Sequence, residues 1–127
     1  MSPIRMSRVE SGIRTVLAFN EALNRHDIEG MIYLITDDCV FESPDPAPEG
    51  SVYAGKEAIT HYWQKFFRKS PHAQIKIEDI SGLGDQCVMR WRYNWTDIDD
   101  VEGYVRGVDI INVRDGFICE MLSYVKG

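Results

Sequence analysis

The feature that most constrains the fold is a run of alternating side chains from Cys87 to Trp95. Large apolar or aromatic residues occupy every second position, namely Met89, Trp91, Tyr93 and Trp95. The residues between them are polar, namely Arg90, Arg92 and Asn94. A period of two is typical of a β-strand with one face buried. Such a strand needs partners, and the C-terminal half offers similar runs at 74–80, 104–114 and 117–125, with an Asp115-Gly116 hairpin turn before the last. We therefore expect a four-strand antiparallel meander.

The N-terminal half has a different period. Ile59, Tyr62, Trp63, Phe66 and Phe67 follow helical spacing, after Gly55 and before Ser70-Pro71. An earlier helix is predicted from Ser7, which has capping-box spacing to Glu10, to about residue 26. Asp27 is the expected N-cap of a short second helix. Asp37-Asp38 is expected to break the helical pattern after it. A short strand at 39–42 and a proline-rich loop at 43–51 then lead to the third helix.

Helices and strands are thus segregated along the chain, which is typical of an α+β fold with an antiparallel sheet. With 127 residues the chain is long enough for one domain and one core, so we predict a single domain over residues 1–127. Three N-terminal helices would pack on the sheet.

Charge and composition argue against several classes of partner. The formal net charge is 14 − 20 = −6. Lys65, Arg68 and Lys69 form the nearest approach to a basic cluster, and their helical spacing indicates a solvated helix face. We therefore expect neither nucleic acid nor a membrane as partner. No apolar N-terminal leader is visible, and the three cysteines show no metal-binding or disulfide-like spacing, which favours reduced thiols and a cytoplasmic location.

Motifs for metals and nucleophiles are missing from the sequence. No HxxxH, HExxH, CxxC or GxSxG spacing occurs, so no metal and no cofactor is expected. His61 lies beside the apolar stripe of the third helix, where a structural role is the more common one.

Four segments resemble a known family. The chain is similar to the nuclear transport factor 2-like superfamily and, within it, to the SnoaL-like polyketide cyclase group. The segments are Ala22-Leu23-Asn24-Arg25-His26-Asp27, Asp37-Asp38-Cys39-Val40-Phe41-Glu42, Tyr53-Ala54-Gly55-Lys56-Glu57-Ala58-Ile59 and Arg114-Asp115-Gly116-Phe117-Ile118. The resemblance implies a strongly curved, mixed but mainly antiparallel sheet that forms a cone around an apolar pocket, as in NTF2-like and cystatin-like folds. It does not select one activity, since this superfamily includes enzymes, transport factors and assembly domains.

Carrying the family's catalytic positions onto this chain leaves one carboxylate. The general base of the ketosteroid isomerases matches Ser43, and their oxyanion-hole tyrosine matches Phe19, so both groups are replaced. The catalytic aspartate of the limonene epoxide hydrolases matches Ser123. The second oxyanion donor of the isomerases matches Asp109, and the SnoaL-like cyclases use an acid/base aspartate in the same strand. The resemblance therefore implies that Asp109 is the acid/base group.

Asp109 also stands out on physical grounds, because it lies among β-branched residues in a central strand. A buried carboxylate either finds a partner or has a raised pKa, and a raised pKa suits acid/base catalysis. The alternatives are an ion pair with Arg90, Arg92 or Arg106, or exposure to solvent. Tyr93 is the predicted hydroxyl partner of Asp109 and a donor to a developing oxyanion.

The expected pocket is aromatic-walled and has few polar groups, which is typical of small-molecule sites. Aligning the strands and helices by the family resemblance implies the substrate-binding residues, which are Phe19, Trp63, Phe67, Met89, Trp91, Trp95, Met121 and Ser123. Loop 43–51 would border the entrance of the pocket. For any single aromatic residue, simple core packing is the competing interpretation.

The preferred function is cofactor-independent acid/base chemistry, an aldol cyclisation or an isomerisation, on a small apolar carbonyl compound. The alternative is a domain of the same fold that binds a small molecule, or only assembles, without turnover. The family resemblance also implies a homodimer in which the outer sheet face, with Arg90, Arg92, Asn94 and Asn112, contacts the partner.

Overall fold

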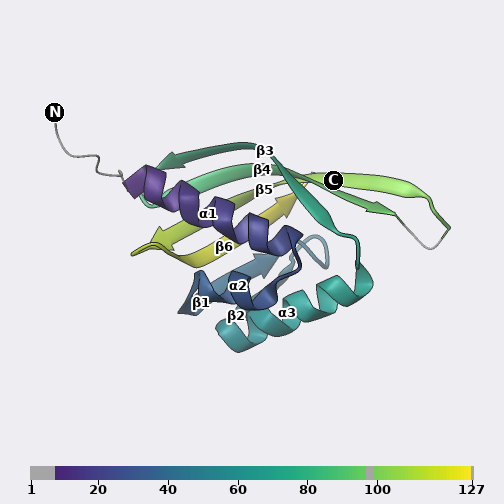
Figure 1. Cartoon of the computed structure of the whole chain (residues 1–127), viewed down its shortest axis with the longest axis horizontal. Coiled ribbons are helices and arrows are strands. Elements are labelled where there is room, and N and C mark those ends of the chain that lie inside the picture. The colour runs from purple at the N-terminus through teal and green to yellow at the C-terminus, as the bar shows by residue number, and fades with distance from the viewer. Residues whose placement is uncertain (1–7, 97–98, 127) are drawn as a thin grey trace.

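The structure is a computed structural model that describes residues 8–96 and 99–126. The predicted capping residue Ser7 lies outside this range. Figure 1 shows the order of the elements along the chain. They are α1 (Arg8–Asn24), α2 (Ile28–Tyr33), β1 (Ile35–Ser43), β2 (Ser51–Ala54), α3 (Lys56–Lys69), β3 (Gln74–Leu83), β4 (Gln86–Thr96), β5 (Glu102–Arg114) and β6 (Phe117–Val125).

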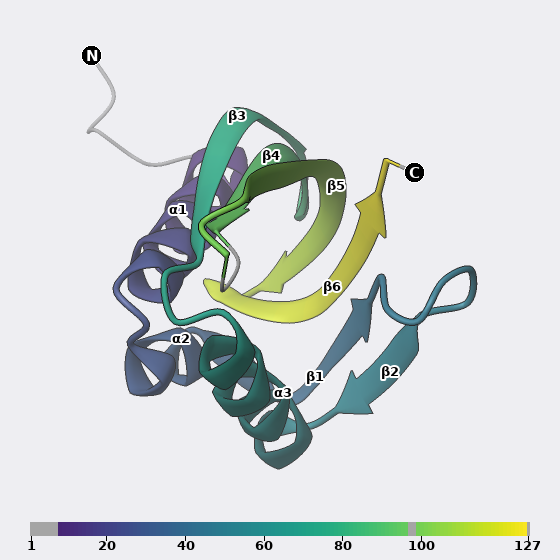
Figure 2. The same cartoon turned by 90° about the vertical axis from the view of Figure 1, so that its right-hand side faces the viewer.

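The strands form one mixed sheet in the order β2-β1-β6-β5-β4-β3. Strands β3 to β6 form the predicted antiparallel meander, and β1 joins β6 in the parallel direction. The sheet curves strongly but does not close, so β2 and β3 are its edges (Figure 2). The α+β class and the curved, mainly antiparallel sheet predicted from the sequence are confirmed.

The helices lie inside the curve of the sheet (Figure 2). Helix α1 packs on β3 and β4, while α3 packs on β1 and β2. Asn24, at the end of α1, holds the edge strand β3 in place, because its amide accepts from the Ile75 N–H at 2.8 Å and donates to the Ile75 carbonyl at 2.9 Å. The hydrophobic core lies between the helices and the sheet and consists of the side chains that these elements direct toward each other.

Local sequence signals explain where helices α2 and α3 begin and where α3 ends. The Asp27 carboxylate accepts a hydrogen bond from the Gly30 N–H at 3.0 Å, which confirms Asp27 as the N-cap of α2. Gly55 precedes α3 with a φ of 89°, a left-handed value that favours glycine. Helix α3 ends at Lys69, just before Ser70-Pro71 as predicted.

The prediction for the first strand region was incomplete. The segment after the proline-rich loop is a strand, β2, whose residues 51–54 pair antiparallel with 40–43 of β1. The loop is therefore the tip of a hairpin.

Strand β1 also begins earlier than expected, and Asp37 and Asp38 belong to it instead of preceding it as a break. Both carboxylates are exposed at an irregularity of the β1–β6 register, where Asp38 pairs with Arg114 at 2.6 Å. Charged residues are tolerated there because neither is buried.

Candidate active site

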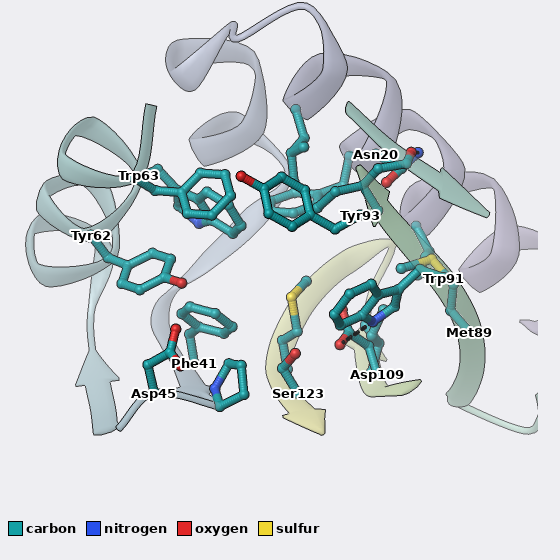
Figure 3. Close-up of a pocket in the computed structure, with 18 residues that line it drawn as sticks. Asn20, Phe41, Asp45, Tyr62, Trp63, Met89, Trp91, Tyr93, Asp109 and Ser123 are labelled. Atoms are coloured by element: carbon teal, nitrogen blue, oxygen red, sulfur yellow. Dashed lines mark hydrogen bonds between the residues drawn. The ribbon is translucent and has the colours of Figure 1, made fainter. Parts of the chain in front are cut away.

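A cavity of about 130 Å³ lies between the helices and the sheet (Figure 3). Its walls are mainly apolar. Helix α1 contributes Val16, Phe19, Asn20 and Leu23. The β1 end and α3 contribute Phe41, Pro44, Asp45, Tyr62, Trp63 and Phe66. The meander contributes Ile75, Met89, Trp91, Tyr93, Asp109, Ile111, Met121 and Ser123.

Asp109 is a buried carboxylate in the wall of this cavity, with only 8% of its surface exposed. It lies in β5, opposite Met89 of β4 and Ser123 of β6. The indole Nε1–H of Trp91 donates to Asp109 Oδ1 at 2.8 Å (Figure 3). Burial raises the pKa of Asp109 to about 6, although hydrogen bonds from Ser123 and Trp91 favour the ionised form. The carboxylate is thus poised to gain or lose a proton near neutral pH.

The arginines of the neighbouring strands do not neutralise Asp109. Arg90 pairs with Asp79 at 3.7 Å, and Arg106 pairs with Glu78 at 2.8 Å. The Arg92 guanidinium lies 3.8 Å from the ring centroid of Tyr104. All three lie on the opposite face of the sheet from Asp109, as their alternation along β4 and β5 requires. The alternatives of an arginine pair and of solvent exposure are therefore excluded for this carboxylate.

The Trp91–Asp109 hydrogen bond depends on Gly107, which pairs with Trp91 across β4 and β5. A Cβ at position 107 would overlap the Trp91 ring and the Tyr124 carbonyl. The indole therefore lies directly over the β5 backbone at Gly107, and any residue other than glycine at this position would collide with it. From there its N–H reaches the carboxylate two residues further along the strand.

Tyr93 lines the cavity but is not the partner that was predicted for Asp109. Within the described residues no hydrogen bond joins the two side chains, and the Tyr93 hydroxyl points away from Asp109 (Figure 3). The Tyr93 ring lies near Phe66, with centroids 5.7 Å apart. Residues 93 and 109 are offset along the sheet, since Met89 and not Tyr93 is opposite Asp109. The direct partners are Trp91 and Ser123, so Tyr93 could act on Asp109 only through a bound molecule.

Six of the eight predicted substrate-binding residues line the cavity, namely Phe19, Trp63, Met89, Trp91, Met121 and Ser123. The placement of the other two was wrong. Phe67 is buried behind the cavity wall, where its ring stacks on His26 with centroids 4.2 Å apart. The apolar stripe of α3 is therefore wider than the cavity. Trp95 is 39% exposed and covers Gly103 near the far end of β4, beyond the cavity. The alternating pattern predicted correctly which face of the sheet Trp95 lies on, but it did not predict how far along β4 the cavity extends.

Three polar groups of the cavity were not predicted from the sequence, namely Asn20, Tyr62 and Asp45. The Asn20 amide donates to the Ile75 carbonyl at 3.1 Å. Tyr62 was assigned only to the apolar stripe of α3, but its hydroxyl points toward the Asp45 side chain (Figure 3). Burial, together with the charge of Asp45, raises the pKa of Tyr62, so its hydroxyl remains protonated. Asp45 belongs to the loop that was expected to border the entrance. That expectation was the only available signal for it.

Ser43 occupies the position that matches the general base of the isomerases. It is almost fully buried, and its hydroxyl donates to the Asp45 carbonyl at 2.9 Å. Its observed contact thus fixes the start of the loop. No second carboxylate replaces it at that position.

Residues 8–96 and 99–126 contain neither a metal-binding cluster nor a membrane-spanning helix. No group of three His, Cys, Asp or Glu side chains lies close enough to hold a metal ion. No helix in this part of the chain has the length and apolar character needed to cross a bilayer.

Comparisons with known proteins agree with this architecture. The model of the SnoaL-like domain family matches residues 16–121, so the chain belongs to the SnoaL-like family. An NTF2-like protein of unknown function from Mesorhizobium loti is 33% identical, with 99% of this chain and 98% of that one covered and a TM-score of 0.80. The predicted family is confirmed.

More distant structures share the fold. One is a putative SnoaL-like polyketide cyclase from Jannaschia sp. CCS1, with 15% identity, 98% and 92% coverage of the two chains and a TM-score of 0.83. Another is a putative ketosteroid isomerase from Kribbella flavida, with 16% identity, 97% and 83% coverage and a TM-score of 0.79. No curated protein matches the chain in sequence. The comparisons support a family of small-molecule enzymes in general.

Proposed function

We propose that this protein is a cyclase or isomerase that performs acid/base chemistry on a small apolar carbonyl compound, with Asp109 as the group that moves the proton. The observation that carries the proposal is Asp109 itself. It is a buried carboxylate with a pKa of about 6, held by two neutral donors in the wall of an apolar cavity. A structural aspartate would normally be paired with a cation or exposed.

The reaction begins with a carbonyl compound in the cavity. Because the pKa of Asp109 is about 6, roughly nine-tenths of the carboxylate is ionised at pH 7 and can accept a proton. It takes the proton from the carbon next to the carbonyl, and the electron pair of that C–H bond moves toward the carbonyl oxygen. The resulting enolate needs a hydrogen-bond donor for its oxygen. Tyr93 is the proposed donor, and the Tyr62 hydroxyl lines the same cavity.

The proton then returns from Asp109 and completes the cycle. In an isomerisation it goes to a different carbon of the same conjugated system. In an aldol cyclisation the enolate carbon forms a bond with a second carbonyl carbon of the molecule, and the new alkoxide takes the proton. Both routes balance without an oxidant or reductant, and both leave Asp109 ionised.

Three features of the site support these roles. The indole N–H of Trp91 and the hydroxyl of Ser123 orient the carboxylate without neutralising it. The apolar walls disfavour water, which would otherwise protonate an enolate. The family likeness to a putative polyketide cyclase and a putative ketosteroid isomerase agrees with chemistry next to a carbonyl.

A ligand panel tests the proposal. Thermal unfolding of wild type and Asp109→Asn is measured with aromatic polyketides, steroids and small enones, and each stabilising compound is then assayed for conversion. We expect at least one class to stabilise both proteins but to be converted only by wild type. Stabilisation of both proteins without conversion by either would establish the alternative, a binding domain. Conversion that survives in Asp109→Asn would remove Asp109 from the mechanism.

A further inference from the structure

A second hollow lies on the outer side of the cavity wall. This groove has a volume of about 480 Å³ and runs between α3 and the loop that joins β1 to β2. Its polar side chains on α3 are His61, Lys65 and Lys69. The facing wall includes Pro46 of the loop and Tyr53 of β2.

The groove and the inner cavity share three residues, Asp45, Tyr62 and Phe66. The Tyr62 hydroxyl and the Asp45 side chain face each other at this boundary (Figure 3). The two hollows are therefore neighbours, and these three side chains form the wall between them. A molecule too large for the inner cavity would have to displace Tyr62 or Asp45 to reach the groove.

The groove is basic although the chain is acidic. His61, Lys65 and Lys69 follow one another at intervals of four residues, which places them on one side of α3. Among the described residues neither lysine has a carboxylate partner. Elsewhere such pairs are common, as for Lys56 with Asp37 and for Arg106 with Glu78. The only carboxylate in the lining of the groove is Asp45, at its inner end.

We propose that this groove binds the negatively charged end of an elongated organic anion whose apolar end occupies the inner cavity. Lys65 and Lys69 contact the anionic group, a carboxylate in the simplest case, and Phe66 and Tyr62 contact the part between the two ends. The inference rests on the proposed function and narrows its substrate class to apolar carbonyl compounds that carry an acidic group. The Asp45 carboxylate repels an anion from the inner cavity, so the charged end stays outside.

Two probes of equal shape test this proposal, biphenyl-4-carboxylate and biphenyl-4-carboxamide. Their binding is measured by quenching of tryptophan fluorescence in a Trp95→Phe background, because Trp63 and Trp91 line the inner cavity and Trp95 does not. We expect the carboxylate to bind about tenfold more tightly than the amide at low salt, as two partly screened lysine contacts would give. Raising the salt from about 20 mM to about 500 mM should remove most of this preference.

A matched pair of variants separates the groove from the net charge of the protein. In Lys65→Glu/Lys69→Glu both groove lysines are reversed, and the preference for the carboxylate should disappear or invert. Arg68→Glu/Lys76→Glu changes the net charge by the same amount at exposed residues that do not line the groove. This control should keep most of the preference. If the first variant fails to fold, Lys65→Gln/Lys69→Gln with Arg68→Gln/Lys76→Gln as its control makes the same separation, and only the groove variant should lose most of the preference.

The outcomes distinguish this inference from the proposed function. Equal binding of the two probes, or a preference that survives in Lys65→Glu/Lys69→Glu, overturns the groove but leaves an inner cavity that accepts aromatic compounds. An equal loss of preference in both double variants also overturns it, because the effect would then be one of net charge. Absence of quenching by either probe up to about 1 mM, a concentration at which even weak sites bind, also overturns the groove, whereas the proposed function is tested separately by conversion of compounds in the ligand panel.

Discussion

Two aspartates line the same cavity, and their surroundings differ in almost every respect. Asp109 lies in the middle of the sheet, is buried and accepts hydrogen bonds from Trp91 and Ser123. Asp45 lies in the loop between β1 and β2, is exposed, and also borders the outer groove. The residue type is identical, so the difference comes from position. A strand in the centre of a sheet excludes water from a carboxylate, whereas a hairpin loop leaves it solvated.

Proximity to a ligand is therefore not enough to make a carboxylate catalytic. Desolvation disfavours the charged form of Asp109, which makes proton transfer near neutral pH possible. Its two neutral donors prevent the pKa from rising further. Asp45, by contrast, is exposed to solvent. We therefore expect the two carboxylates to respond differently to the same substitution.

The largest expected effect is on turnover. Asp109→Asn removes the proton acceptor and should lower kcat by about 10²- to 10⁴-fold, the usual contribution of a general base. Asp45→Asn keeps the loop and should leave most of kcat intact. Both are measured with a compound found in the ligand panel. Equal losses in the two variants would abolish the distinction between the two sites.

The next effect is on stability, with a sign opposite to that on activity. Since the folded pKa of Asp109 is about 6 and its ordinary value is 3.8, the folded protein disfavours the ionised form. The cost is absent below pH 3.8, grows between these values and is complete above pH 6. Asp109→Asn should therefore raise the free energy of unfolding at pH 7.5 by about 2–3 kcal/mol, and by much less at pH 4.

Urea unfolding at the two pH values checks this prediction. Asp45→Asn is the matched control, and we expect no comparable gain because its carboxylate is solvated. If Asp109→Asn changed stability equally at pH 4 and pH 7.5, burial of the charge would not be the cause.

A smaller effect should follow from removing one donor to Asp109. Trp91→Phe keeps an aromatic ring over Gly107 but deletes the N–H, so the pKa of Asp109 should rise by about one unit, as the loss of a hydrogen bond to a charged group predicts. The midpoint of the pH–rate profile should move to higher pH, with about a tenfold loss of kcat/KM below it. An unchanged midpoint combined with lower activity would indicate a role in packing alone.

The smallest effect concerns Tyr93. Tyr93→Phe removes a hydroxyl that has no hydrogen bond to Asp109, so the pH midpoint should stay where it is. If Tyr93 donates to the oxyanion, kcat should fall by about tenfold, less than the usual loss of about 10²- to 10³-fold for a single donor, because the Tyr62 hydroxyl lines the same cavity and can substitute in part. Unchanged turnover would remove Tyr93 from the mechanism, and Tyr62→Phe would then be the next variant to measure.

The sequence predicted the elements that have a strong period, and these make up most of the fold. Helix α3 and strand β4 are long enough for their spacing to be unambiguous. Strand β2 was missed because four residues are too few to show alternation next to a loop rich in proline. Asp37 and Asp38 were expected to break the pattern before the strand. They lie in β1 instead, at the irregularity of its register with β6, where both side chains are exposed and aspartate is tolerated.

The candidate site was predictable only in part, for geometric reasons. Alternation along β4 and the family resemblance together identified Asp109, Met89 and Trp91 as inward residues. How far a residue lies along a curved strand is not encoded in its period, which is why Trp95 was misplaced. The contact of Tyr62 with the cavity depends on the rotation of α3, and the position of Asp45 depends on the loop conformation. Neither can be read from spacing.

Gly107 has a consequence for how this site can change during evolution or engineering. The hydrogen bond between Trp91 and Asp109 requires empty space at position 107, so part of the proton-transfer machinery is encoded by a missing side chain. A library restricted to residues that face a ligand would never sample this position. Gly107→Ala would nevertheless displace the Trp91 indole and, through the weakened hydrogen bond, change the pKa of Asp109. Homologues that have a larger residue here would need a different donor, so this glycine is a useful marker for subdividing the family by chemistry.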